Sequence, residues 1–166
     1  MFNPKSLVPG ALLAATLSLP LTAHAAQPGL YLGVGLGSAD DVILDETSAA
    51  SKVFAGINLN RFLGMEVSYV NLGDYVNGAI TQDGVAYEVV GHLPLSPYVD
   101  VFGKVGAFDW QVRSGSLRSR GTDRDYGFGL SAEVSPRVWI RGEYQKFLDV
   151  DGGDVNLASV SVAYHF

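Results

Sequence analysis

The sequence ends on Ser159-Val-Ser-Val-Ala-Tyr-His-Phe166, and this stretch decides the fold. Its apolar side chains occupy every second position, namely Val160, Val162, Tyr164 and Phe166, with small or polar residues between them. A period of two with one fully apolar face is typical of a strand that has lipid on one side and a crowded polar interior on the other. Chain ends of soluble proteins usually fray and are polar, so this ending favours a membrane-embedded sheet.

The other end of the sequence carries a secretion signal. Lys5 is the only charge before an apolar run from Ala11 to Leu21, and Ala23-His24-Ala25 offers small residues for cleavage. This pattern predicts a signal peptide over residues 1–25 and a mature domain over residues 26–166. A membrane anchor is the alternative, but prolines interrupt the run and it is shorter than the ~20 residues of a spanning helix.

The composition excludes several classes of protein. The 17 acidic residues outnumber the 11 basic ones, and loss of the signal peptide takes the net charge from −6 to −7, which argues against a nucleic-acid partner. The absence of cysteine excludes a disulfide scaffold, a thiolate metal site and thiol catalysis. The mature part fits one domain and has no apolar run that suits a spanning helix, so any membrane crossing must use strands.

Eight segments of the mature sequence alternate between apolar and polar positions. Each is close to the roughly 9 to 11 residues of a tilted membrane-spanning strand. The predicted strands cover about residues 29–37, 52–60, 62–70, 85–93, 98–112, 126–134, 138–147 and 159–166. Nearly every charged residue within them lies on the face opposite the aliphatic row, which favours a barrel with a polar interior and an apolar wall.

The connections between these segments alternate in length. Short turns are predicted near residues 60–61, 94–97 and 135–136, and longer polar loops over about 38–51, 71–84 and 113–125, with a shorter one at 148–155. Short periplasmic turns with longer outer loops are typical of outer-membrane barrels. We therefore predict an all-β fold, an eight-stranded antiparallel up-and-down transmembrane β-barrel. A soluble lipocalin-like barrel is the alternative, and it would have its apolar side chains inside.

Three segments resemble the transmembrane barrel of the outer-membrane protein A family. They are Gly64-Met-Glu66-Val-Ser-Tyr69, Asp100-Val-Phe-Gly-Lys104-Val-Gly106 and Arg141-Gly-Glu143-Tyr-Gln145. The ending Ser161-Val-Ala-Tyr-His-Phe166 is similar to the last strand of that family and to the signal read by the outer-membrane assembly machinery. The resemblance covers the whole mature chain and is to the barrel domain only.

The resemblance implies a location, partners and an interior salt bridge. It implies an integral protein of the bacterial outer membrane that contacts membrane lipids and lipopolysaccharide, and we expect a monomer. Val160, Val162, Tyr164 and Phe166 would serve as the assembly signal. By position, Glu66 and Arg141 resemble the partners of one interior bridge, and Lys104 occupies the place of another interior basic residue.

Nine ionisable residues are expected to face the interior and form a network. They are Lys52, Glu66, Glu88, His92, Asp100, Lys104, Glu133, Arg141 and Glu143. A buried charge without a partner is strongly destabilising, so these groups need one another. Eight strands leave an interior only wide enough for side chains, which favours a polar plug. A narrow pore of low conductance is the alternative.

The third long loop is the best candidate for a contact surface. Arg113, Arg118, Arg120 and Arg124 cluster there, whereas the other three loops are acidic. Arginine binds phosphate well, and lipopolysaccharide presents phosphates at this height. The cluster therefore suggests contact with lipopolysaccharide or another partner. Charge pairing with the acidic neighbouring loops is the alternative.

Catalysis and metal binding find little support. A serine nucleophile needs a histidine within hydrogen-bond reach, and only His92 and His165 remain in the mature chain. Asp149-Val-Asp151-Gly-Gly-Asp154 lacks the spacing and closing glutamate of a calcium loop. We expect no catalytic residue, metal or cofactor, and a structural, envelope-integrity or surface-interaction role such as adhesion. A lipid A-modifying barrel enzyme is a further alternative.

Overall fold

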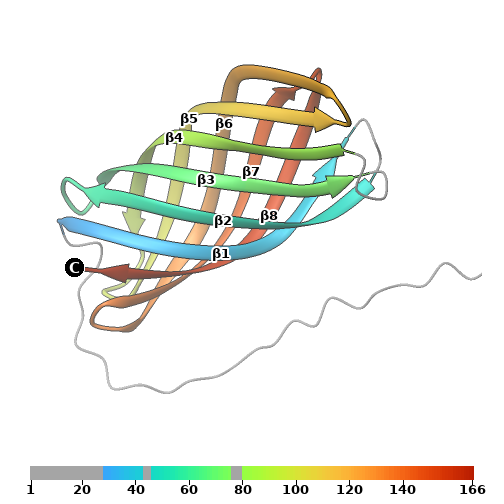
Figure 1. Ribbon diagram of the computed structural model, residues 1–166. Helices are drawn as coiled ribbons and strands as arrows, with labels where there is room; N and C mark the ends of the chain where they lie inside the picture. Colours follow the sequence, from blue (N-terminus) through green and yellow to red (C-terminus); the bar gives the residue numbers. More distant parts are fainter. Residues whose placement is uncertain (1–27, 43–45, 76–79) are drawn as a thin grey trace, which may run out of the picture.

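A closed barrel is formed by residues 28–42, 46–75 and 80–166, which the computed structural model describes (Figure 1). Its eight antiparallel strands follow one another in chain order, and the last pairs with the first. They are β1 Gly29–Asp41, β2 Glu46–Asn58, β3 Leu63–Tyr75, β4 Ile80–Pro94, β5 Val99–Ser114, β6 Leu117–Ser135, β7 Val138–Val150 and β8 Gly153–His165. The predicted eight-stranded antiparallel barrel is confirmed.

The three short turns lie at one end of the barrel, where the C-terminus also lies (Figure 1). They join β2 to β3, β4 to β5 and β6 to β7, as predicted. The N–H of Leu59 donates to the carbonyl of Leu63 at 2.9 Å, and the N–H of Leu95 donates to that of Val99 at 2.9 Å. We call this the short-turn end and the opposite one the far end.

The predicted signal peptide, residues 1–25, lies outside the described residues, which contain no helix able to cross a membrane.

The strands are longer than predicted, at 13 residues in the shortest and 19 in β6. The prediction of long polar loops over residues 38–51, 71–84 and 113–125 and of a shorter loop over 148–155 is wrong, because most of these residues extend the strands. The stretches between strand ends at the far end are only residues 42–45, 76–79, 115–116 and 151–152.

The extra strand length was hidden by a shift in the apolar row. On β5, Val101 and Val105 face outward, whereas Phe108, Trp110 and Val112 face inward. Since the interval from Val105 to Phe108 is odd, the apolar row changes face while the strand pairing continues unbroken. A search for one outward row therefore ends most of the strands too early, although the predicted segment 98–112 already extends past the change of face on β5. The same change separates Leu36 from Ala39, Tyr69 from Val70, Tyr144 from Phe147 and Leu157 from Val160.

Three layers of side chains occupy the inside of the wall. Nearest the short-turn end, Tyr31, Phe54, Trp139 and Ala163 form a small apolar cluster. Charged side chains lie next, and a larger apolar cluster fills the far half. This cluster, the far core, consists of Ala39, Ala50, Val70, Leu72, Ala86, Phe108, Trp110, Val112, Phe147, Val150, Val155 and Leu157.

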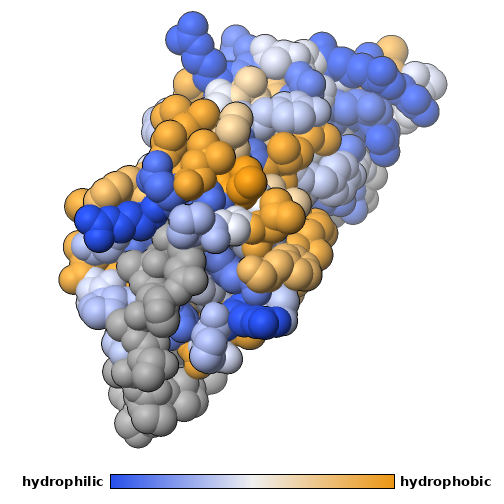
Figure 2. All heavy atoms as spheres, turned by 90° about the vertical axis from the view of Figure 1, so that its left-hand side faces the viewer, coloured by the Kyte–Doolittle hydropathy of each residue, from blue (hydrophilic) through white to orange (hydrophobic). Residues whose placement is uncertain are grey.

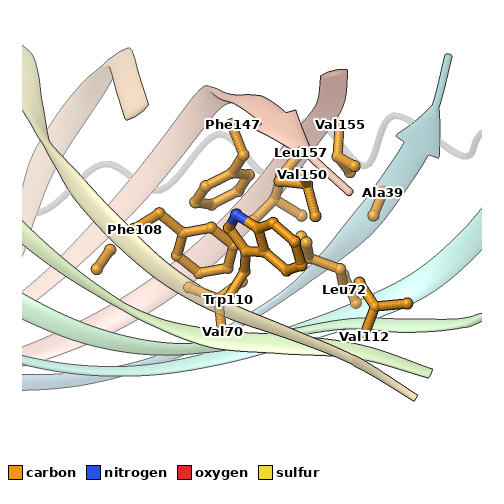
Figure 3. Packing of buried hydrophobic residues seen from close by; sticks show 12 residues of the cluster. Ala39, Val70, Leu72, Phe108, Trp110, Val112, Phe147, Val150, Val155 and Leu157 are labelled. Carbon is orange, nitrogen blue, oxygen red and sulfur yellow. The ribbon is translucent and has the colours of Figure 1, made fainter. Parts of the chain in front are cut away.

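Side chains from opposite walls meet in the far core (Figure 3). The rings of Phe108 and Phe147 lie 4.3 Å apart, and both are fully buried. Trp110 points toward them, and its indole N–H donates to Asp123 at 2.8 Å. The expected polar interior thus describes the middle layer and not the far half. There the barrel has apolar side chains inside and polar ones outside, as soluble barrels do.

The outer face carries an apolar band next to the short-turn end. Leu36, Phe128 and Val160 belong to it and are 60 to 75% exposed. Figure 2, which views the molecule from this end, shows apolar residues gathered in patches on the wall and hydrophilic ones toward the upper right. Tyr126 is the last apolar residue of the outward row on β6 before the far end. Exposed apolar side chains in this number require a lipid environment.

Candidate functional site

Lys104 of β5 is the centre of the charged layer. Its Nζ lies 2.6 Å from Oε1 of Glu143, 2.9 Å from Oε1 of Glu88 and 3.4 Å from Oε1 of Glu66. The three carboxylates come from β7, β4 and β3, so this one ammonium group links walls on both sides of the lumen. All four side chains are inaccessible to solvent. A cation with three partners is the arrangement that allows charges to remain buried.

Two further cations complete the network. Nη1 of Arg141 lies 2.6 Å from Oε2 of Glu66, and Nζ of Lys52 lies 2.8 Å from Oε2 of Glu143. The guanidinium of Arg141 also stacks on Phe54 and Phe102, at 4.8 and 4.3 Å from their ring centres. We call Lys52, Glu66, Glu88, Lys104, Arg141 and Glu143 the charge network. It holds three cations and three carboxylates, so the opposite charges balance.

Neutral side chains that sequence analysis missed hold the carboxylates in place. The hydroxyl of Tyr31 donates to Oε2 of Glu66 at 2.9 Å, and Nε2 of Gln145 donates to Oε1 of Glu88 at 2.8 Å. The Ser68 hydroxyl lies within 3.3 Å of Glu66 and 3.2 Å of Glu88. Glu66 and Glu88 stand directly opposite each other on β3 and β4, where like charges repel. The inward parity of these neutral residues is the one sequence signal that could have identified them.

His92 and Asp100 form a separate polar group nearer the short-turn end. Nδ1 of His92 lies 2.7 Å from Oδ2 of Asp100, and the Ser131 hydroxyl donates to Oδ1 of the same carboxylate. Asp100 thus stands between the serine and the histidine. Among the described residues no hydrogen bond joins Ser131 to His92, so the group differs from a nucleophile activated by a neighbouring imidazole.

His92 and His165 line one small cavity beside this group. Its volume is about 20 Å³, which is room for about one water molecule. The His165 ring stacks on Tyr31 at 5.3 Å and lies 5.4 Å from the Trp139 ring. Glu133, the remaining residue of the predicted interior set, lines a cavity of about 240 Å³ at the short-turn mouth. No set of three His, Cys, Asp or Glu side chains in the described part of the chain could hold a metal ion.

The four arginines lie on strands and not in a loop. Arg113 belongs to β5, and Arg118, Arg120 and Arg124 belong to β6, all with exposed side chains on the outer face. Their assignment to a loop is wrong because the β5–β6 hairpin continues beyond the change of apolar face. Arg113 stands directly opposite Arg118. We call these four residues the arginine row.

The arginine row is mostly without carboxylate partners. Nη2 of Arg113 lies 3.6 Å from Oδ1 of Asp83, and the Arg113 side chain remains 47% exposed. Within residues 28–42, 46–75 and 80–166, no ion pair involves Arg118, Arg120 or Arg124. Pairing with acidic neighbours therefore accounts for one arginine of the four.

The acidic β7–β8 hairpin is closed by its own contacts. Nζ of Lys146 lies 2.7 Å from Oδ2 of Asp154, and the N–H of Asp149 donates to Oδ1 of the same residue at 3.2 Å. These hydrogen bonds lower the pKa of the exposed Asp154 carboxyl. Asp149 and Asp151 adopt left-handed conformations, with φ of 57° and 51°, that form the tight turn. The carboxylate of Asp154 is thus used within the hairpin.

Comparison with known sequences agrees with this architecture. The model of the outer membrane protein beta-barrel domain matches residues 10–166. Outer membrane protein A of Salmonella typhi is 28% identical over 145 residues, a match that covers 73% of this chain and 41% of that protein. The chain therefore spans about two fifths of the length of the curated relatives it matches.

Solved structures share the fold. The N-terminal barrel of Pseudomonas aeruginosa OprF has a TM-score of 0.66 at 14% identity and covers 84% of this chain and 100% of its own. Neisserial surface protein A has a TM-score of 0.68 at 17% identity and covers 83% and 97%. At these identities the likeness shows the fold alone. From the family match and the closed eight-stranded wall together, the chain belongs to the outer membrane protein beta-barrel family and is an integral barrel of the bacterial outer membrane.

Proposed function

We propose that this barrel is a surface-contact protein that supports the envelope, and that its arginine row binds the phosphate groups of lipopolysaccharide. In outer-membrane barrels the short turns face the periplasm, which directs the far end to the outside. The observation that carries the proposal is a set of exposed guanidinium groups, three of them without carboxylate partners among the described residues, on the outer face of the far half.

The height of the arginine row fits this role. Tyr126 closes the apolar band on β6, and Arg124 is the next outward residue. Arg118 lies six residues further along the strand, which is about 20 Å at the rise of ~3.3 Å per residue. The row therefore begins where hydrocarbon ends and continues through the layer of charged lipid headgroups. Arginine binds phosphate through two parallel hydrogen bonds, which suits this layer.

The interior supports a contact role over a conducting one. The small apolar cluster at the short-turn end, the charge network and the far core follow one another along the axis, and the side chains of each layer are buried. An ion would have to pass both the paired charges and the apolar side chains. A narrow pore of low conductance remains the second candidate, and recording from single barrels in planar bilayers tests it: stepwise openings would contradict the contact-only role.

A lipid A-modifying enzyme is the third candidate and receives less support. Ser131, the serine of the His92–Asp100 group, donates to Asp100 on the inner side of the wall, at the end remote from lipopolysaccharide. We therefore assign no catalytic residue in this proposal. Mass spectrometry of lipid A from cells with and without the protein tests the assignment, since a mass change would require an enzyme.

The test of the proposal is a matched pair of double variants. R118Q/R124Q removes two charges from the arginine row, and R61Q/R137Q removes two from the short turns of the opposite end. An exposed ion pair contributes up to ~1 kcal/mol, and the double variant removes two such pairs. R118Q/R124Q should therefore lower the affinity for lipopolysaccharide about tenfold. R61Q/R137Q should bind as the unchanged protein does. Equal affinity of both variants would rule out the arginine row.

A further inference from the structure

An outer groove lies beside the arginine row on the wall formed by β3 to β6. Its volume is about 450 Å³, within the range of sites for small organic ligands. Polar side chains supply most of its lining: Tyr69, Asp83, Asp109, Gln111, Arg120 and Thr122. Arg120 belongs to both the groove and the arginine row.

The floor of the groove is rigid. Gly84, Trp110 and Gly121 stand side by side on β4, β5 and β6 and line it with their backbones. On the inner side, Trp110 packs in the far core and is hydrogen-bonded to Asp123. A ligand would therefore meet a surface whose shape is set by the closed barrel, with little conformational entropy to lose on binding.

The hydrogen-bonding groups of the groove alternate between acceptors and donors. Asp83 and Asp109 supply carboxylate oxygens, Arg120 supplies guanidinium N–H groups, and Tyr69 and Thr122 supply hydroxyls. Tyr69 already donates to Asp83 at 3.2 Å, and Thr122 donates to Asp109. Two carboxylates would repel a phosphate placed between them. The same carboxylates accept hydrogen bonds from neutral hydroxyl groups, so the lining suits a ligand with many hydroxyls.

The position of the groove restricts its ligand further. Tyr69 is 49% exposed at the edge of the apolar band, and Arg120 is two outward positions beyond Arg124 on β6. The groove therefore begins at the level where acyl chains end and headgroups start. Lipopolysaccharide carries pyranose rings at this level, directly joined to the phosphates that the arginine row would bind.

We propose that the outer groove binds a pyranose ring of the lipopolysaccharide saccharide, while the arginine row binds the adjoining phosphates. The inference rests on the proposed function and adds a second determinant, recognition of the sugar itself. A divalent cation is a poorer occupant, because the described residues offer no group of three acidic or histidine ligands. The carboxylates and the guanidinium group in the lining also make an acyl chain a poorer occupant.

The experiment measures which lipids stay bound to the purified barrel in native mass spectrometry. The probes are lipid A, lipid A from which both phosphates have been removed, and phosphatidylcholine. D109N/T122V alters the groove, and R118Q/R124Q alters the arginine row outside it. D40N/T47V is the matched control, because Thr47 donates to Asp40 at 2.6 Å across β1 and β2 in the same kind of exposed pair.

We expect the unchanged barrel to retain dephosphorylated lipid A above phosphatidylcholine. D109N/T122V should reduce that retention about tenfold, the loss of one hydrogen-bonded site to a charged group. D40N/T47V should not change it. R118Q/R124Q should reduce the advantage of lipid A over its dephosphorylated form about tenfold, since Arg113 and Arg120 remain, and should leave binding of the dephosphorylated form unchanged.

The two hypotheses fail in different ways. Undiminished binding of dephosphorylated lipid A by D109N/T122V overturns the groove assignment, although the arginine row can still be correct. An unchanged phosphate advantage in R118Q/R124Q overturns the proposed function. Val85 of β4 also lines the groove, so V85F provides a second groove variant that fills space and removes no polar group. V89F, on the same outer face of β4, is its control. Boiled and unboiled gel mobilities confirm that each barrel is closed.

Discussion

Replacing Lys104 by methionine tests the charge network most directly. The substitution keeps most of the side-chain volume and removes one of the three buried cations. Glu66 keeps Arg141 at 2.6 Å, and Glu143 keeps Lys52 at 2.8 Å. Among the described residues Glu88 has no second cation, and it keeps its hydrogen bonds with Gln145 and Ser68. The damage should therefore concentrate on one carboxylate.

The expected magnitude follows from that loss. Removing one partner of a buried pair costs ~3–5 kcal/mol, a large part of the ~5–15 kcal/mol that stabilises a typical domain. Lys52→Met makes the same change in net charge, but Glu143 retains Lys104 at 2.6 Å, so we expect ~1–3 kcal/mol. The double variant K104M/E88Q removes both members of the broken pair and should regain most of the lost stability.

The assay is urea unfolding of the barrel in phospholipid vesicles, followed by tryptophan fluorescence. Trp110 and Trp139 face inward in different layers and are 8% and 5% exposed, so both should report opening of the wall. K104M destabilising no more than K52M would refute the central role of Lys104. Failure of E88Q to rescue K104M would refute the identification of Glu88 as the uncompensated group.

Three further predictions concern other parts of the wall. Phe108→Ala should open a cavity against Phe147 and lower the free energy of unfolding by ~3–5 kcal/mol in the same urea assay. A much smaller loss would mean that neighbouring side chains move in to fill the cavity. Lys146→Gln should change stability by less than ~1 kcal/mol, because its pair with Asp154 is exposed; a larger shift of the urea midpoint would contradict this. Phe166→Ser should reduce the amount of heat-modifiable barrel in outer-membrane fractions if the last strand is the assembly signal, and an unchanged amount would exclude that role for Phe166.

The apolar band explains why so much of the fold could be predicted. Lipid imposes strict alternation on the outer face, so the facing of residues such as Leu32, Glu66 and Arg141 follows from parity alone. The short turns interrupt that alternation and were located for the same reason. Beyond the band the wall is surrounded by water, so its outer face need not be apolar. There the apolar residues move to the inner face and the sequence pattern resembles that of a loop. For this reason the sequence predicts a loop where the arginine row lies on strands.

The composition of the charge network was easier to predict than its pairing. Charged residues at inward positions must find partners, but the partners depend on which strands face each other across the lumen. Lys104 reaches carboxylates on β3, β4 and β7, and this geometry depends on the stagger of eight strands, which no local pattern contains. Neutral residues such as Tyr31 and Gln145 give no charge signal at all.

The change of apolar face also sets the depth at which the barrel lies in the membrane. A downward slip by one outward position on β6 would pull Arg124 into hydrocarbon, where arginine costs up to ~2–4 kcal/mol at full depth, and an upward slip would lift Tyr126 into water. Neighbouring strands change face at corresponding positions, so all of them resist the same displacement. The far half of the barrel encloses its own apolar core and needs no lipid around it. The β5–β6 hairpin can therefore project to a constant height above the membrane, whatever the thickness of the surrounding saccharide layer.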